Sequence, residues 1–356
     1  MRLQICYGLL IMGLLGACSG KDKTQEKMVD LKSVSDKPDL KIARLTEAIE
    51  KEPKNAVLYA QRSRLYLDLK KNEEALKDAE KAISLDASNG EFFFLKAKAQ
   101  RALNRLEAAL SSAKAAETKN YRQAELYILM GEIFIIVKQY QQAIDYLNQA
   151  LKLSSFNEFA YFYKGIVYAE SGDTTRAISN FQTAIEQSPE FVEPYNELAK
   201  IHTAQRKFGE AHQYIQSGLR FDGSNAFLHY NEGVNLVRQN LADSAAASFK
   251  QALLADTAMY LANYNLGVIA YNKDKYADAA VYFEKGLHHA DKLPNLNLLL
   301  ADSYEKSGRR EDALRQYNVV LQKQPENSFA LKAVRRLTRQ PKNAIDTTAK
   351  SNRSGQ

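Results

Sequence analysis

The residue types that carry most protein chemistry are few and scattered in this chain of 356 residues. Metal ligands, general bases and nucleophiles would come mainly from seven side chains, which are His202, His212, His229, His288, His289, Cys6 and Cys18. No two histidines have the i, i+4 spacing that places two metal ligands on one helix face. We find neither a Ser-His-Asp order nor a glycine-rich phosphate loop. We therefore expect no enzyme, no metal site and no cofactor.

Cys18 is the one residue whose surroundings favour a defined reaction. Arg2 precedes an apolar run, from Ile5 to Ala17, that is typical of a secretory signal and too short to span a bilayer. The sequence Leu15-Gly16-Ala17-Cys18 resembles a bacterial lipobox. This resemblance implies a signal peptide over residues 1–17, cleavage before Cys18, and acylation of its sulfur and its new amine. The alternative is an ordinary signal peptide with a chance cysteine.

Charge and cysteine content restrict the partners and the compartment. The net charge is +7, but residues 328–356 hold seven Lys or Arg and one Asp, so the rest of the chain is near neutral. A near-neutral body lacks the broad basic face that nucleic-acid binding needs. No cysteine follows Cys18, which suits an oxidising periplasm. Residues 18–38 alternate in charge and predict a flexible tether, and Ser19 resembles the outer-membrane sorting preference. We expect a lipid-anchored protein of a diderm bacterium, at the outer membrane and facing the periplasm.

A period of 34 residues organises the rest of the chain. Alanine recurs in one register, at Ala75, Ala109, Ala143, Ala177, Ala211, Ala245, Ala279 and Ala313. A small residue stands twelve positions before each alanine, namely Ser63, Ala97, Gly131, Gly165, Ala199, Gly233, Gly267 and Ala301. This period indicates helix hairpins that stack into a solenoid, with small residues where the two helices of a hairpin cross. With alanine at position 20, the eight repeats are 56–89, 90–123, 124–157, 158–191, 192–225, 226–259, 260–293 and 294–327.

The repeats also match a known motif. Leu266-Gly267, Tyr276, Ala279, Phe283 and Gly286 resemble the tetratricopeptide motif, as do Met130-Gly131, Phe134, Tyr140, Ala143, Leu147 and Ala150. The resemblance covers residues 56–327 and implies an all-α fold, an α-solenoid wound as a right-handed superhelix. Apolar patterns predict capping helices within 39–55 and 328–339, as solenoid ends require. Residues 340–356 are polar, and we expect them to be disordered.

The tetratricopeptide resemblance implies that positions 2, 5, 9 and 12 of each first helix face a concave groove. In the fourth, sixth and seventh repeats these positions are mostly apolar or aromatic: Phe159, Phe162, Ile166, Phe227, Tyr230, Val234, Val237, Leu261, Tyr264, Val268 and Tyr271. The fifth repeat inserts Glu193, Asn196, Lys200 and Thr203 between them. Exposed aromatic stripes beside polar groups mark partner sites. The alternative is that these rings pack between adjacent first helices.

The histidines and the polar pair of the fifth repeat have simpler interpretations than catalysis. His202 and His229 stand at positions 11 and 4, where other repeats have aromatic residues, so we expect them to pack in the core. We assign His288-His289 to a helix end. The two-carboxylate clamp of chaperone-binding relatives needs Lys and Asn at positions 5 and 9. Here Asn196 and Lys200 stand in the opposite order, so we do not expect capture of a C-terminal carboxylate.

These features predict a non-catalytic scaffold or adaptor. Its groove would bind a peptide or helix of another envelope protein. By resemblance, such lipoproteins serve cell-wall, outer-membrane assembly, pilus or secretion machinery. The alternative is a structural protein that self-associates into a homo-oligomer.

Overall fold

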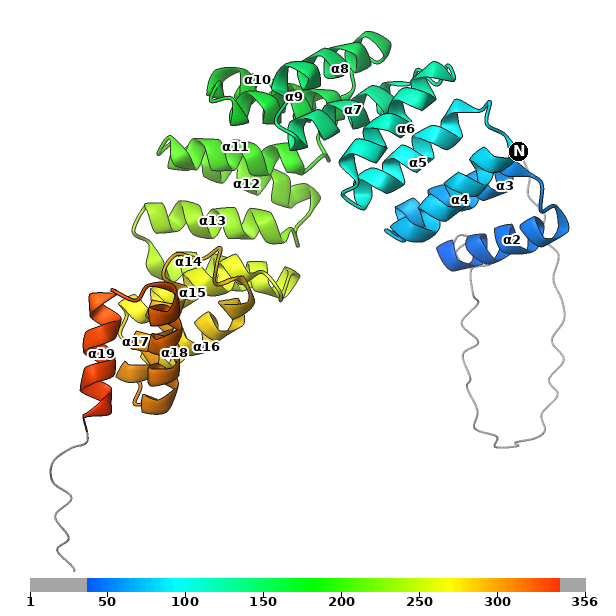
Figure 1. Ribbon diagram of the computed structural model, residues 1–356. Helices are drawn as coiled ribbons and strands as arrows, with labels where there is room; N and C mark the ends of the chain where they lie inside the picture. The colour runs from blue at the N-terminus through cyan, green and yellow to red at the C-terminus, as the bar shows by residue number, and fades with distance from the viewer. Residues whose placement is uncertain (1–36, 340–356) are drawn as a thin grey trace, which may run out of the picture. The chain divides into compact units, whose positions relative to one another are not determined.

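The computed structural model describes residues 37–339, which form eighteen α-helices, one short 3-10 helix and no strand (Figure 1). The predicted all-α solenoid fold is confirmed. The predicted signal peptide, Cys18, nearly all of the tether and the polar tail lie outside the described residues.

The helices alternate in the register that the sequence indicates. The first helices of the repeats are α3 (Ala56–Asp68), α5 (Gly90–Ala102), α7 (Ala124–Ile136), α9 (Glu158–Glu170), α11 (Glu193–Ala204), α13 (Ala226–Arg238), α15 (Tyr260–Asn272) and α17 (Leu296–Lys306). Each second helix begins at position 17: α4 (Asn72–Leu85), α6 (Leu106–Thr118), α8 (Tyr140–Leu153), α10 (Thr174–Gln187), α12 (Phe208–Phe221), α14 (Ala242–Ala255), α16 (Tyr276–Gly286) and α18 (Arg310–Lys323). The 3-10 helix η1 (Leu287–His289) extends α16. Two further helices, α2 (Pro38–Lys51) and α19 (Ser328–Thr338), stand at the ends.

Small residues lie where the helices of a hairpin cross. The position-20 alanines, Ala177 among them, are fully buried. In the first repeat the Ser63 hydroxyl donates to the backbone carbonyl of Ala75 at 2.7 Å. Where position 8 is glycine, the opposing group is the side chain at position 24. A Cβ atom on Gly165, for example, would lie 2.5 Å from Cε1 of Phe181.

The turn inside each repeat has one fixed backbone geometry. Position 15 has a positive φ in all eight repeats, at Lys70, Asn104, Lys138, Gly172, Arg206, Asn240, Asp274 and Gly308. A left-handed residue is a common way to end an α-helix, and it frees the next residue to start the second helix. Only two of the eight are glycine, although glycine adopts this geometry at the least cost.

Two polar contacts recur where a repeat begins. Asparagine at position 34 caps the following first helix, as Asn157 does by accepting from the amide of Ala160 at 2.9 Å. The position-4 side chain reaches back six residues, as the Tyr195 hydroxyl does when it donates to the carbonyl of Pro189 at 3.0 Å. Both contacts fix the direction in which the chain enters the repeat.

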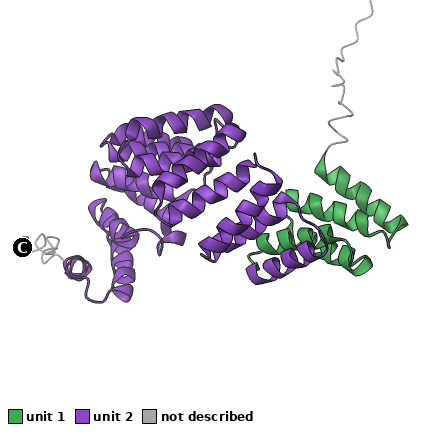
Figure 2. Ribbon diagram, turned by 90° about the horizontal axis from the view of Figure 1, so that it is seen from above, with its two compact units in different colours: residues 1–105 green, residues 106–356 purple. Residues whose placement is uncertain are grey.

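The chain divides into two compact units, residues 1–105 and 106–356 (Figure 2). The boundary falls inside the second repeat, between α5 and α6. In the second unit, α19 packs on α18, and Arg336 binds Glu305 of α17 through two hydrogen bonds of 2.7 and 2.8 Å.

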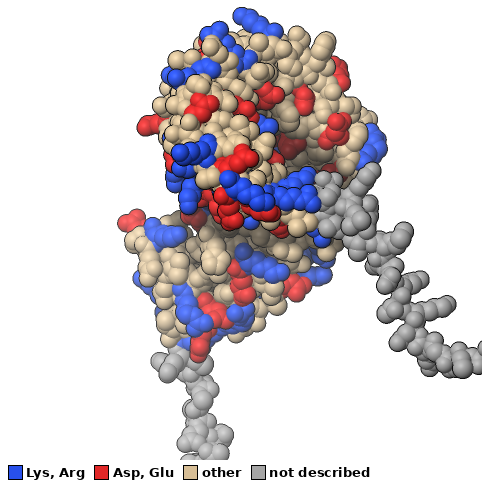
Figure 3. All heavy atoms as spheres, turned by 90° about the vertical axis from the view of Figure 1, so that its right-hand side faces the viewer, with Lys and Arg blue, Asp and Glu red and all other residues tan. Residues whose placement is uncertain are grey.

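The described surface is mixed in charge. On the face drawn in Figure 3, Lys and Arg are interspersed with Asp and Glu over the body. Within residues 37–339, no helix is both long enough and apolar enough to cross a membrane.

Candidate partner-binding groove

A groove of about 850 Å³ lies in the second unit, over four successive first helices. One side chain comes from α9, four come from α11 and four from α13. The rest come from the turn before α15 and from its first residues. The lining residues are Phe162, Glu193, Asn196, Glu197, Lys200, Phe227, Tyr230, Asn231, Val234, Asp256, Ala258, Met259, Tyr260 and Leu261.

The polar part of the groove is ordered by contacts within and between helices. Lys200 donates to both carboxylate oxygens of Glu197, at 2.9 and 2.7 Å. The Asn231 amide on α13 donates to the Asn196 side-chain oxygen on α11 at 3.0 Å. Because Glu197 neutralises Lys200, the carboxylates of Glu193 and Asp256 leave the groove with a net negative charge.

Aromatic rings form the apolar part. The Phe162 ring packs against Phe181 and Phe191, with centroids 5.8 and 5.1 Å apart. Tyr230 packs on Phe249 at 5.6 Å, and its burial raises the pKa of its hydroxyl. Phe227 is 62% exposed although it is a large apolar residue. Such a ring beside ordered polar groups can contribute apolar contact to a ligand at little further conformational cost.

The structure brings together five of the eleven residues predicted to bind a partner: Phe162, Phe227, Tyr230, Val234 and Leu261. Three others from the same helices lie outside the groove. Phe159 is 44% exposed and packs against Phe191, while Ile166 packs on the buried cluster around Phe181. Val237 is 39% exposed.

The remaining three predicted residues lie against a core cluster that the seventh and eighth repeats form together. Tyr264, Val268 and Tyr271 pack against the core cluster that includes Leu300 and Tyr304. The Tyr264 hydroxyl donates to the carbonyl of Pro294 at 2.9 Å. Tyr264 also packs on Phe283 of its own repeat, with ring centroids 6.0 Å apart. The assignment of these three residues to a partner site stays a prediction.

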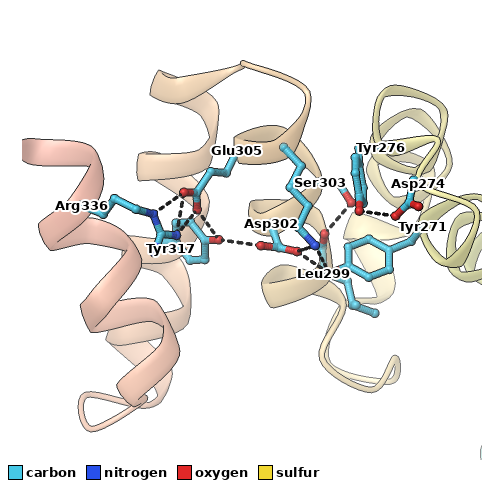
Figure 4. A network of polar contacts seen from close by, with 10 residues as sticks. Tyr271, Asp274, Tyr276, Leu299, Asp302, Ser303, Glu305, Tyr317 and Arg336 are labelled. Atoms are coloured by element: carbon cyan, nitrogen blue, oxygen red, sulfur yellow. Dashed lines mark hydrogen bonds and ion pairs between the residues drawn. The ribbon is translucent and has the colours of Figure 1, made fainter. Parts of the chain in front are cut away.

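Tyr271 belongs to a polar network between the seventh and eighth repeats (Figure 4). Its hydroxyl donates to Asp302 and accepts from Lys306 at 3.0 Å. Burial and the Asp302 carboxylate together raise the pKa of Tyr271. The network stabilises the interface between the two repeats, because its side chains form hydrogen bonds with one another.

Several lining residues were missed by the sequence analysis. Asn231 stands at position 6, which the motif does not assign to the groove. The one sequence feature that could have indicated it is Asn196, a second asparagine at position 5 of the preceding repeat. Met259 precedes α15 and Tyr260 is its first residue, and positions 2, 5, 9 and 12 include neither of them. The Tyr260 ring stacks on His289 at 4.0 Å, so His289 supports the wall of the groove.

The histidines have structural contacts. His202 is 8% exposed and stacks on Tyr214 at 5.3 Å, which confirms the predicted core packing. At position 4, His229 places Nε2 3.1 Å from the carbonyl of Gly223, the contact that tyrosine makes in other repeats. His229 is partly exposed, so it lies at the edge of the core. Among residues 37–339, no cluster of His, Cys, Asp and Glu has a geometry that would hold a metal ion.

Family models identify the repeats. Models described as tetratricopeptide repeat match residues 56–89, 124–157, 162–226, 230–294 and 297–327, together more than half of the chain. The chain belongs to the tetratricopeptide repeat family. Members of this family bind other proteins through such arrays. The matches 56–89 and 124–157 have the same bounds as two repeats of the 34-residue frame.

Curated relatives share the repeats over part of their length. The chain is 28% identical over 149 residues to protein O-mannosyl-transferase TMTC1 of Mus musculus, covering 41% of this chain and 15% of that protein. It is 42% identical over 72 residues to small glutamine-rich tetratricopeptide repeat-containing protein 2 of Saccharomyces cerevisiae, covering 18% and 21%. The chain thus spans less than a quarter of either relative.

Solved structures share the fold. The Cut9–Hcn1 hetero-tetramer of the APC/C has a chain similar over 84% of this chain and 58% of its own, with 18% identity and a TM-score of 0.57. PilW, described as a widely conserved type IV pilus biogenesis factor, is similar over 60% of this chain and 97% of its own, with 18% identity and a TM-score of 0.50. At such identities the likeness concerns the tetratricopeptide fold alone.

Proposed function

We infer that this protein is a non-catalytic scaffold of the bacterial envelope, lipidated at Cys18, and that its groove binds a peptide or helix of another envelope protein. The observation that supports this proposal is the groove across α9, α11, α13 and α15. Its aromatic walls are partly exposed, and its polar side chains are held in place before any ligand arrives. Preorganised polar groups and rigid rings reduce the entropy that binding costs.

The groove assignment is tested by crosslinking in cells. A photoreactive residue at Val234 would capture the partner, and Phe227→Ala with Tyr230→Ala should lower the yield at least about tenfold, as loss of central aromatic contacts does. Phe156→Ala is the matched control, because Phe156 is 76% exposed and does not line the groove. An unchanged yield in the double variant, with unchanged helix content by circular dichroism, would show that the groove is not the binding site.

The anchor is tested separately. We propose acylation at Cys18 and an outer-membrane position that faces the periplasm. Replacement Cys18→Ser should release the protein from the outer-membrane fraction, and globomycin should cause the uncleaved precursor to accumulate. A Cys18→Ser protein that stays with the outer membrane after a carbonate wash would contradict the anchor and leave the groove proposal intact.

The alternative function, a self-associating structural protein, makes a different prediction. Its apparent mass would rise with protein concentration in sedimentation velocity, and Phe227→Ala or Tyr230→Ala would reverse the rise. A mass that stays at that of one chain over a hundredfold range of concentration would remove this alternative.

A further inference from the structure

The groove of the second unit presents an acidic side chain beside exposed aromatic rings. At position 2 of the repeat frame stand Phe159 in α9, Glu193 in α11 and Phe227 in α13, and the two rings are 44% and 62% exposed. The helices α11 and α13 pack directly on each other (Figure 1). Glu193 and Phe227 both line the groove. The Glu193 carboxylate is exposed, and within residues 37–339 no side chain pairs with it.

The charge of this groove is negative for a specific reason. Of the described residues that line it, only Lys200 is a cation, and Lys200 donates to both carboxylate oxygens of Glu197, at 2.9 and 2.7 Å. Asp256 is a further exposed carboxylate in the lining. Its Oδ1 accepts from the amide of Ala258 at 2.9 Å, a backbone contact that leaves its charge in place. The groove therefore attracts a cationic segment and repels an acidic one.

The chain itself shows which cation combines with a ring and a carboxylate. Arg176 lies over the Tyr168 ring, 4.6 Å from its centroid, and donates to Asp173 at 2.6 Å. Arg309 lies in the same way over Tyr304, at 4.2 Å, and is bonded to two carboxylates. A planar guanidinium can do both at once, because it donates from its edge and stacks on its face. The described lining of the groove offers rings and carboxylates without an arginine.

We propose that the groove selects a partner segment that carries an arginine beside large apolar side chains, an inference that rests on the binding function proposed above. The guanidinium pairs with the Glu193 carboxylate and covers the exposed Phe227 ring. The apolar neighbours of the arginine contact Tyr230, Val234 and Met259. Apolar contact supplies most of the affinity. The arginine sets partner choice, because a segment that buries Glu193 without a cation leaves a charge unpaired.

The chain's own arginines lack the apolar neighbours that this site requires. Residues 340–356 hold one large apolar side chain, Ile345, and it is not adjacent to Arg353. In a second copy of the chain, α19 would offer Arg335 with Val334 and Leu337. Those two apolar side chains already pack against the core cluster of the last repeats. A segment of a different protein therefore fits the groove better than either part of this chain.

The test uses the full chain and three short fluorescent peptides, whose binding is read by anisotropy. The peptides share flanking leucine and phenylalanine and differ only in a central arginine, lysine or citrulline, which keeps the shape of arginine without its charge. The arginine probe should bind about tenfold more tightly than the citrulline probe and more tightly than the lysine probe. Higher salt should weaken the two charged probes only.

A charge variant shows whether the arginine meets Glu193. Glu193→Gln should lower the affinity for the arginine probe at least about threefold and leave the affinity for the citrulline probe unchanged. The matched control is Glu186→Gln, because Glu186 is exposed on α10 and does not line the groove. An arginine probe that does not bind, or that binds equally to Glu193→Gln and the wild type, would overturn the inference.

Further outcomes separate this inference from the function on which it rests. Equal binding of the arginine and citrulline probes, both lost in Phe227→Ala/Tyr230→Ala, would overturn the arginine inference and keep the groove as a peptide site. Probe binding that survives Phe227→Ala/Tyr230→Ala would contradict the groove itself. Deletion of residues 340–356 should not change the affinity. A gain of affinity on that deletion, or a dimer that the probe dissociates in sedimentation velocity, would assign the groove to the chain itself or to a second copy.

Discussion

At the scale of single residues, glycine and alanine at the helix crossings are not equivalent. Gly165, Gly233 and Gly267 each lie against a phenylalanine ring, and an added Cβ would come within 2.5 Å of it. Ala199 lies in the repeat whose position 24 is Ile215, a side chain without such a ring. In these three hairpins the glycine at position 8 therefore leaves room for the phenylalanine ring at position 24.

Gly165→Ala should therefore destabilise the protein by about 1–3 kcal/mol, because the fully buried Phe181 ring has no space to move into. Urea unfolding measures the change. Gly209→Ala is the matched control: no atom lies within 4 Å of its added Cβ, and it should be neutral or stabilising by up to about 1 kcal/mol. Adding Phe181→Ile to Gly165→Ala copies the pair of the fifth repeat and should recover part of the loss. Wild-type stability of Gly165→Ala would contradict this matching.

His202 gives a pH-dependent prediction. Burial lowers its pKa, with Lys207 acting in the same direction and Glu210 against it, and neither ring nitrogen has a hydrogen-bond partner in the described structure. A lowered pKa means that the unfolded chain binds the proton more tightly, so stability is full above the unfolded pKa of about 6.5 and is lost as pH falls below it.

Between pH 7.5 and pH 5.5, His202→Phe should therefore lose less unfolding free energy than the wild type. One proton accounts for at most about 1.4 kcal/mol per pH unit. Phenylalanine fits because position 11 is Phe134 in the third repeat. Urea unfolding across this pH range measures the slope, and His229→Phe serves as a control at a partly exposed histidine. If the unfolding free energies of His202→Phe and the wild type change in parallel with pH, His202 is not the source of the pH dependence.

At the scale of elements, the sequence predicts what repeats and leaves open what differs. The alanine register predicts the positions of the helices, because every hairpin needs a small residue where its two helices cross. The sequence does not predict the left-handed backbone at position 15, because lysine, asparagine, aspartate and arginine stand there as well as glycine. The sequence also does not predict that Tyr230 lines the groove while Tyr271 forms a hydrogen bond with Asp302. That distinction depends on what the next repeat supplies.

The position-15 geometry predicts a stabilising substitution. Lys138 has φ of 59°, a conformation that costs a non-glycine residue about 1–2 kcal/mol. Part of this gain is offset because glycine loses more backbone entropy on folding. Lys138→Gly should therefore raise the unfolding free energy by about 0.5–1 kcal/mol, and the reverse change Gly172→Ala should lower it by a similar amount. Differential scanning calorimetry of both variants measures the pair. A lower melting temperature for Lys138→Gly would contradict the prediction.

At the scale of the whole molecule, the core of residues 37–339 is divided into several clusters. Its hydrophobic clusters follow one another along the chain, and each involves neighbouring repeats. In such an array stability is close to a sum of repeats and nearest-neighbour contacts. Damage at one end should then stay local, and the groove over α9 to α15 should tolerate the loss of the terminal helix.

A chain that ends at Asn327, and so lacks α19, tests this locality. Removing α19 uncovers the Val320 and Tyr317 side of α18 and frees Glu305 from Arg336. We expect local stability to fall by about 2–4 kcal/mol, mostly from lost burial of Val334 and Leu337, because an ion pair whose arginine is exposed contributes less. Hydrogen exchange should accelerate in α17 and α18 and stay unchanged in α13, whereas a chain that ends at Arg339 should match the full chain throughout. Faster exchange in α13 would mean that the array unfolds as one cooperative unit, and the groove would then depend on its cap.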